Sequence, residues 1–120
     1  MKFSVSLKKN EDFRRVYGRK RSFANKYFIM YILENESIYN RLGISVSKKV
    51  GNSVVRHRVV RLVRESYRLN EERFNSGLDL VVVARITAAD IDYKAAESAL
   101  LHLAKLHGIL VDRAPLDEQA

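Results

Sequence analysis

The side chains best suited to chemistry in this chain are the arginines between Val50 and Arg68, in the stretch VGNSVVRHRVVRLVRESYR. At 100° per residue, a helix over this stretch has two unlike faces. The apolar arc holds Val55, Val59, Leu62, Val63, Tyr67 and Leu69, and the basic arc holds Arg56, His57, Arg61, Arg64 and Arg68. Guanidinium groups at this spacing repel one another unless an anion lies between them, and their planar forks match phosphate oxygens. A solvated charged face would carry interleaved acids, but only Glu65 is present, so the helix predicts a polyanion partner, RNA or DNA.

The charge of the chain is concentrated in its first part. Residues 1–68 hold 17 Lys and Arg against 5 Asp and Glu, a net charge of +12, whereas residues 69–120 hold 5 against 9, a net charge of −4. This asymmetry indicates one surface that acts electrostatically. A basic amphipathic helix can also bind a membrane, but such helices carry bulky Trp, Phe or Leu on the apolar face. The valines here suit packing on a β-sheet better, so no membrane partner is expected.

Length and composition predict a single soluble domain. A chain of 120 residues is long enough for one core and too short for two. It has no cysteine, which excludes disulfides and thiolate metal sites and fits a reducing cytosol. The N-terminus has no apolar run typical of a signal peptide, and no segment is long and apolar enough to span a membrane. We therefore expect a soluble intracellular protein.

Periodicity and capping residues predict an α-β-β-α-β-α order, with residues 3–7 as a further candidate strand. A short helix is expected from Asn10, its N-cap, with acids in its first turn. Strands are expected at 27–33, 41–47 and 80–84, with the Arg-rich helix beginning at Asn52 or Ser53. A last helix is expected from Asp90 or Asp92 to Gly108, with an inward stripe of Ala96, Leu100, Leu103 and Leu106. The prediction is an α+β fold: one α-β sandwich of about four strands in a mixed sheet and three helices. The Arg-rich helix and the last helix share one face. Residues 1–108 would form a single RNA-binding domain and residues 109–120 a loosely ordered tail.

The other face of this sheet is predicted to hold a trough. Strand 41–47 alternates, so Leu42, Ile44 and Val46 face the core while Gly43, Ser45 and Ser47 face the other way. Strand 27–33 is apolar on both faces, so either Tyr27, Ile29 and Tyr31 or Phe28, Met30 and Ile32 line the trough. The first helix brings Phe13 and Tyr17, four residues apart, to its edge. An aromatic cleft walled by arginines suits single-stranded nucleic acid, but the same aromatics could equally be core beneath the first helix.

Three blocks of this sequence resemble the protein subunit of bacterial ribonuclease P. They are Leu7–Tyr17 (LKKNEDFRRVY), Arg41–Asn52 (RLGISVSKKVGN) and Arg56–Glu65 (RHRVVRLVRE), in the family's order and spacing, and a weaker likeness extends to about Gly108. The resemblance implies a cytoplasmic accessory protein of a catalytic RNA that removes 5′ leaders from precursor tRNA. It also implies a left-handed crossover from strand 41–47 through the Arg-rich helix to strand 80–84, against the usual right-handed rule.

The resemblance also assigns residues to two binding surfaces. The Arg-rich helix and the residues before it would contact the catalytic RNA: Lys48, Lys49, Arg56, His57, Arg58, Arg61, Arg64 and Arg68. The cleft that receives the leader would be formed by Phe13, Tyr17, Ile29, Tyr31 and Ser45, which selects the Tyr27, Ile29 and Tyr31 face. Two positions depart from the family pattern: His57 replaces an Asn, and Val60 replaces a basic residue. The phosphate contact of the second position therefore does not carry over.

Catalysis by the polypeptide itself is not expected. Magnesium-dependent nucleases need converging carboxylates, and the few acids of the basic half are better explained as helix-start, loop or ion-pair residues. His102 and His107 are five residues apart, which places them about 140° apart on a helix, so no metal site is expected. No protein-bound cofactor is predicted, and the magnesium requirement would belong to the RNA. The alternative function is a ribosomal or translation-factor-like RNA-binding module, similar to domain IV of elongation factor G. A DNA-binding helix-turn-helix is disfavoured because a strand follows the Arg-rich helix, so DNA is not an expected partner.

Overall fold

The computed structural model describes residues 1–111 and places eight main elements along them. They are β1 (Ser4–Ser6), α1 (Asn10–Gly18), β2 (Ser22–Ala24), β3 (Phe28–Glu34), β4 (Asn40–Ser45), α2 (Ser53–Asn70), β5 (Leu78–Ala84) and α3 (Tyr93–His107). Two short 3₁₀ turns, η1 (Glu71–Arg73) and η2 (Ile86–Ala88), flank β5. The α+β class and the three helices are confirmed, while the mixed sheet has five strands instead of about four.

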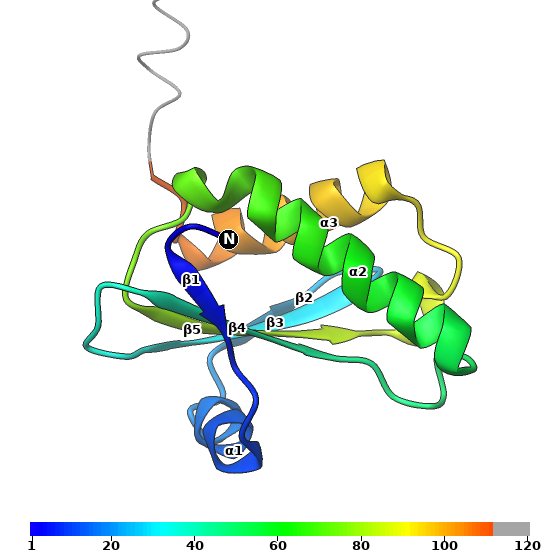
Figure 1. The fold of residues 1–120 in the computed structure, drawn as a ribbon, viewed down its shortest axis with the longest axis horizontal. Coiled ribbons are helices and arrows are strands. Elements are labelled where there is room, and N and C mark those ends of the chain that lie inside the picture. Colours follow the sequence, from blue (N-terminus) through cyan, green and yellow to red (C-terminus); the bar gives the residue numbers. More distant parts are fainter. Residues whose placement is uncertain (112–120) are drawn as a thin grey trace, which may run out of the picture.

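The sheet has the order β1-β4-β5-β3-β2. β1 pairs with β4 and β4 with β5 in parallel, whereas β3 pairs with β5 and with β2 in antiparallel fashion. Helices α2 and α3 cover one face and α1 lies alone on the other (Figure 1). In that view β4 lies in front of β5, both run to the right and α2 lies above them, so the β4–α2–β5 crossover is left-handed, as the resemblance implied.

The main core lies between the sheet and the pair α2 and α3. Phe28, Met30 and Ile32 of β3 point into it and are at most 1% exposed, so the alternation of β3 leaves Ile29 and Tyr31 on the opposite face. At one end of the core, the Tyr67 hydroxyl lies 2.7 Å from Ser4 Oγ and accepts a hydrogen bond from the Asn40 amide at 3.1 Å. These bonds satisfy a phenol that would otherwise be buried without a partner.

Two of the three helices, α2 and α3, begin at the N-cap residues expected from the sequence. Asn52 caps α2 by accepting from Val55 N at 3.0 Å, and Asp92 caps α3 by accepting from Ala95 N at 2.8 Å. α3 ends at Gly108, whose φ of 70° is the left-handed conformation that glycine adopts readily. In α1, Asn10 is already helical and Lys9 holds the N-cap position without a side-chain bond, so the predicted Asn10 cap is wrong.

Two residues predicted to face the core are exposed, and one strand was not predicted. Leu69 is 57% exposed and Leu106 is 45% exposed, because each lies about 120° around its helix from a fully buried neighbour, Val63 and Leu100 respectively. The unpredicted strand, β2, has three exposed residues and therefore lacks the alternation of a half-buried strand.

The chain just beyond α3 is bound to the η1 region. Ile109 is buried, its carbonyl accepts from Asn75 N at 2.7 Å, and Val111 N donates to the Arg73 carbonyl at 2.6 Å. The remainder of the predicted tail lies outside the described residues. Within residues 1–111, none of the helices has the length and apolar character needed to cross a membrane.

Candidate nucleic-acid interface

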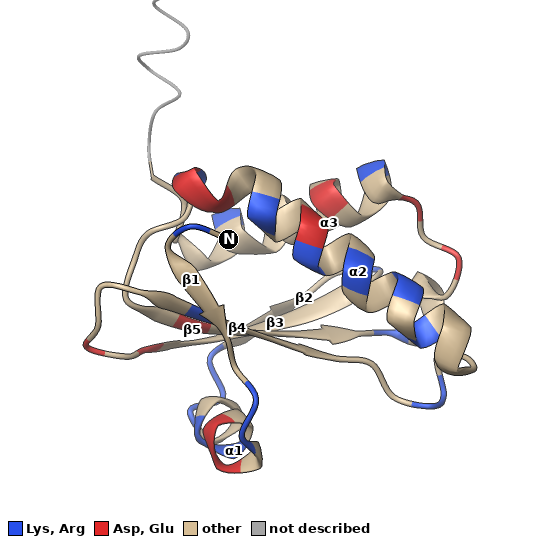
Figure 2. Ribbon diagram, in the orientation of Figure 1, with Lys and Arg blue, Asp and Glu red and all other residues tan. Residues whose placement is uncertain are grey.

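The outer side of α2 carries a row of exposed basic side chains. His57, Arg61 and Arg64 are exposed, as are Lys48 and Lys49 in the loop that precedes the helix. Figure 2 shows Lys and Arg recurring along α2 with a single acidic interruption. Among the described residues no carboxylate pairs with Arg61 or Arg64. Arg61 and Arg64 therefore carry their positive charge without a carboxylate partner in this part of the chain, which suits a polyanion partner.

Arg68 differs from the other exposed arginines because Glu65 neutralises it. The two side chains form an ion pair one helical turn apart, with Arg68 Nε 3.0 Å from Glu65 Oε2. The hydrogen bond from Arg68 lowers the pKa of Glu65, so the pair is charged at neutral pH. Because both groups are exposed, a phosphate could take the place of the carboxylate at little cost.

Arg56 and Arg58 are half-buried and bond to backbone carbonyls. Arg56 Nη1 donates to the Gly51 carbonyl at 3.0 Å, and Arg58 donates to the carbonyls of Ala89 and Ile91 after η2. Arg56 precedes Val63 by seven residues, so it leaves the helix only about 20° from that buried valine. Its predicted place in the basic arc is therefore wrong. Both guanidinium groups tie α2 to neighbouring loops and are oriented differently from Arg61 and Arg64.

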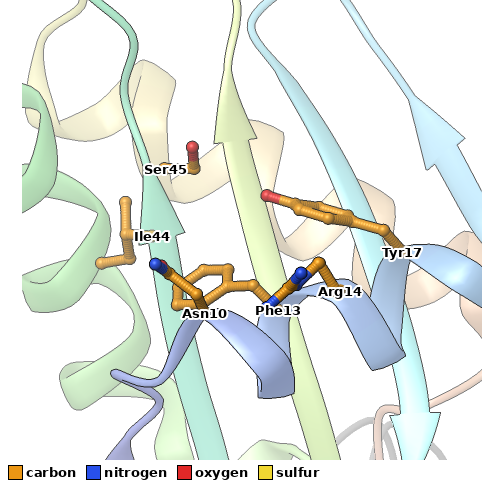
Figure 3. A pocket seen from close by; sticks show the side chains of 6 residues that line it. All are labelled: Asn10, Phe13, Arg14, Tyr17, Ile44 and Ser45. Atoms are coloured by element: carbon orange, nitrogen blue, oxygen red, sulfur yellow. The ribbon is translucent and has the colours of Figure 1, made fainter.

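A cleft lies on the opposite face of the sheet, between α1 and the end of β4. It has a volume of about 540 Å³ and is lined by Asn10, Phe13, Arg14, Tyr17, Ile44 and Ser45. Figure 3 shows the rings of Phe13 and Tyr17 along one wall and Ser45 on the facing strand. Three of these residues, Phe13, Tyr17 and Ser45, were predicted for the cleft from the sequence, whereas Asn10, Arg14 and Ile44 were not; Ile44 was expected to face the core, against which it also packs. The sequence does contain a signal for Asn10 and Arg14, because positions 10, 13, 14 and 17 have the spacing that places them on one face of a helix.

The floor of this face is formed by small and aliphatic side chains in register. Ser45 pairs with Val83, and Val83 pairs with Ile29 across the strands β4, β5 and β3. The neighbouring row contains Gly43 and Tyr31, and the Tyr31 ring meets Tyr17 edge-on at 4.9 Å between centroids. The structure therefore places all five predicted cleft residues on one face, but only Phe13, Tyr17 and Ser45 line the cleft itself.

The absence of a side chain at Gly43 leaves the space that the Phe13 ring occupies. A Cβ atom at position 43 would lie 2.6 Å from Cζ of Phe13, far closer than van der Waals contact allows. The predicted trough thus exists, but part of it is filled by the Phe13 ring. Phe13 and Tyr17 remain half-buried, so each ring belongs both to the packing beneath α1 and to the cleft wall. The structure therefore contains both an open cleft and apolar packing beneath α1.

An ion-pair network fastens α1 to the sheet beside the cleft. Arg41 of β4 donates to Asp79 of β5 at 2.7 and 2.8 Å and to Asp12 of α1 at 3.3 Å. Burial opposes ionisation of Asp79, but hydrogen bonds from Arg41 and Asn35 outweigh it and hold the pKa of Asp79 below its usual value. The same bond to Asp79 raises the pKa of Arg41. Sequence reasoning assigned Asp12 only to the helix start and did not identify this network.

The histidines do not form a metal site within the described residues, where no group of three or more His, Asp and Glu side chains is arranged to hold an ion. His102 lies 3.2 Å from the Asn25 amide nitrogen. His107 is buried, its Nε2 donates to the Met30 carbonyl at 2.8 Å, and its Nδ1 has no partner among residues 1–111. Burial lowers the pKa of His107, although the bond to Met30 opposes this effect.

The fold and these two surfaces define a nucleic-acid-binding protein of the α-β sandwich class, with a basic helix on one face and an aromatic cleft on the other. Comparison with known proteins narrows the class. The family model described as Ribonuclease P matches residues 1–107. The ribonuclease P protein component of Lachnoclostridium phytofermentans is 59% identical over 112 residues, which cover 93% of this chain and 97% of that protein.

Solved structures agree with the sequence comparison. The ribonuclease P protein of Staphylococcus aureus superimposes with a TM-score of 0.81 at 36% identity, covering 88% of this chain and 97% of that one. The ribonuclease P protein of Thermotoga maritima gives a TM-score of 0.78 at 31% identity, covering 84% and 96%. This chain therefore belongs to the ribonuclease P protein family. It is a protein component of that tRNA-processing ribonucleoprotein, and the resemblance seen in the sequence is confirmed.

Proposed function

We propose that this chain is the noncatalytic subunit of ribonuclease P and contacts two RNA molecules with opposite faces of its sheet. The basic side of α2 binds the catalytic RNA, and the cleft beside α1 binds the single-stranded 5′ leader of precursor tRNA. The observation that carries the proposal is the pairing of a row of exposed basic side chains on α2 with an aromatic cleft in one small domain. A row of cations follows phosphates, whereas aromatic rings stack on unpaired bases.

The contact with the catalytic RNA is assigned mainly to side chains that are exposed: Lys48, Lys49, His57, Arg61, Arg64 and Arg68. Arg56 and Arg58 lie at the edge of this surface and hold α2 against its loops, so their part is chiefly to position the helix. The loop with Lys48 and Lys49 runs from the cleft strand β4 to the start of α2. It therefore lies on the path between the two surfaces and can meet RNA from either side.

The leader is assigned to the face that holds Phe13, Tyr17, Ile29, Tyr31 and Ser45, with Asn10 and Arg14 as further residues of the cleft lining. An open cleft with ring edges and small residues accepts bases without demanding one sequence. The hydroxyl of Ser45 and the guanidinium of Arg14 supply hydrogen bonds for phosphates or base edges. Mature tRNA lacks the leader, so this surface favours precursor over product.

The proposed absence of protein catalysis rests on where the acids are. Asp12 and Asp79 bind Arg41, and the Glu71 carboxylate accepts hydrogen bonds from the backbone N–H groups of Lys2 and Phe3. These carboxylates serve the fold and do not converge on a shared metal position. Under this proposal the RNA holds the magnesium ions and cleaves the bond, and the complex acts in the cytoplasm.

The test is a cleavage assay with a ribonuclease P RNA, a precursor tRNA and low magnesium. We expect cleavage when the protein and RNA are combined, much slower cleavage by the RNA alone, and none by the protein alone. Cleavage by the protein without RNA would contradict the noncatalytic assignment. Failure to stimulate the RNA, together with binding to ribosomal RNA, would favour the translation-factor-like alternative.

A further inference from the structure

Helix α1 rests on the sheet through a small apolar cluster that is separate from the main core. Its fully buried members are Leu7, Val16 and Val81. Phe13, Tyr17 and Tyr31 are only partly buried around this cluster, and the first two also form the cleft wall. The distance between that wall and Ser45 therefore depends on how α1 is seated. Three buried aliphatic side chains do not resist sliding strongly, because dispersion contacts are not directional.

Among residues 1–111, the hydrogen bonds that join α1 to the sheet come from one guanidinium group. Arg41 binds Asp79 through Nε at 2.8 Å and Nη2 at 2.7 Å, and Asp12 through Nη1 at 3.3 Å. The Asp79 side chain is 1% exposed and the Asp12 side chain 11%, so both carboxylates are largely removed from water. Asp79 is itself fixed by the Asn35 amide at 2.9 Å. One planar group thus spans from a fixed carboxylate in the sheet to a carboxylate on the helix.

We propose that Arg41 and Asp12 are positioning residues for leader binding, and that their ion pair sets the distance between the aromatic wall and Ser45. Asp12 directly precedes Phe13, so any movement of the first turn of α1 moves the ring as well. Phe13 has little freedom to compensate, because it already contacts Gly43 closely. A lysine at position 41 could not form all three contacts, since an ammonium group lacks the fork of a guanidinium. Neither residue needs to touch RNA in this role.

This inference rests on the proposed function, because it assumes that the leader lies in the cleft. The key variant is Asp12→Asn, which weakens the link from Arg41 to α1 and also the pair between Asp12 and Arg15 at 3.0 Å within the helix, but leaves the Arg41–Asp79 pair intact. Arg41→Lys keeps the Arg15 pair, so a similar loss in both variants assigns the effect to the link with Arg41. Glu11→Gln is the matched control: it removes the same charge from the same helical turn, and Glu11 is exposed. Both variants raise the net charge of the protein by one, so nonspecific attraction to RNA changes equally.

The measured quantity is the ratio of affinities of the reconstituted holoenzyme for precursor tRNA and for mature tRNA. It is measured well below the melting temperature of each variant. Asp12→Asn should lower this ratio by about fivefold or more, the lower limit for loss of one base–aromatic stack. Its affinity for ribonuclease P RNA should stay unchanged. Arg41→Lys should lower the ratio similarly, and Glu11→Gln should preserve it.

The Phe13→Ala variant separates failure of this inference from failure of the proposed function. If Phe13→Ala lowers the ratio while Asp12→Asn and Arg41→Lys preserve it, the leader uses the cleft but the ion pair does not position it. If Phe13→Ala also preserves the ratio, the leader binds elsewhere and both ideas are wrong. Equal losses for Asp12→Asn and Glu11→Gln would assign the effect to helix-start charge and overturn the role of the ion pair.

Discussion

Replacing Arg61 and Arg64 together by alanine should flatten the salt dependence of binding to ribonuclease P RNA. Both side chains are exposed, and neither pairs with a carboxylate among residues 1–111. Each phosphate contact contributes between about 0.7 and 0.9 to the slope of log affinity against log salt. Losing two contacts should lower the magnitude of the slope by about 1.4 to 1.8. Over a fourfold rise in salt, the parent should lose about 7 to 12 times more affinity than the variant.

The control for this prediction is Arg58→Ala, which removes one positive charge from the same helix, as each single replacement in the double variant does. Arg58 is half-buried and donates to the carbonyls of Ala89 and Ile91, so its loss should lower the melting temperature. Its salt slope should change by less than half as much as that of a single exposed arginine. Fluorescence binding titrations at four salt concentrations, with thermal unfolding of each protein, give both quantities. An unaltered slope for the double variant, or an equal change for Arg58→Ala, would refute the assignment of phosphate contacts.

Three further predictions concern the cleft and the buried histidine. Phe13→Ala should weaken equilibrium binding of leader-bearing precursor by about 1 to 3 kcal/mol and leave mature tRNA unaffected, whereas equal losses for both would exclude leader stacking. Gly43→Val should displace the Phe13 ring and reduce the same leader-dependent affinity, while Gly18→Ala, where an added Cβ meets nothing within 4 Å, should not; unchanged leader affinity in Gly43→Val would show that the ring position is unimportant. The pKa of His107 in the folded protein lies below its unfolded value of about 6.5. As the pH falls through about 6.5, the unfolded chain therefore takes up more protons than the folded protein does, and the free energy of unfolding decreases. Urea unfolding between about pH 7 and pH 5 should show this loss, and His107→Gln should remove that part of it; an identical pH profile in the variant would contradict the assignment.

Much of the fold could be predicted from the sequence because the alternation of side chains in strands and the capping of helices depend on residues that are close together in the chain. The alternation in β4 correctly placed Leu42 in the core and Gly43 on the opposite face, beneath α1, because successive side chains in a strand point to opposite sides. Asn52, Asp92 and Gly108 marked helix ends because capping is a local interaction. The exposed face of β3 was chosen by family resemblance, since both of its faces are apolar.

Features that depend on tertiary proximity could not be predicted in this way. Arg41 and Asp79 are 38 residues apart, and only the parallel pairing of β4 with β5 brings them opposite each other. Arg58 is a residue type that commonly contacts RNA, but here its guanidinium group donates hydrogen bonds to two backbone carbonyls of the loop after η2. Residue types predicted which part of the molecule would be basic. Which of the basic side chains are free to bind a partner depends on the segments of the same chain that pack beside them.

The placement of α1 and α2 on opposite faces of the sheet has a consequence for two bound polyanions. A sheet and a helix together are roughly 20 Å thick, because each layer contributes about 10 Å. The Debye length at physiological salt is about 8 Å, so an RNA on the outer side of α2 and a leader in the cleft would be more than two screening lengths apart. Under the proposed function, the domain acts as an electrostatic spacer. It attracts each strand separately while keeping their mutual repulsion small, so the two binding events would be nearly independent in their response to salt.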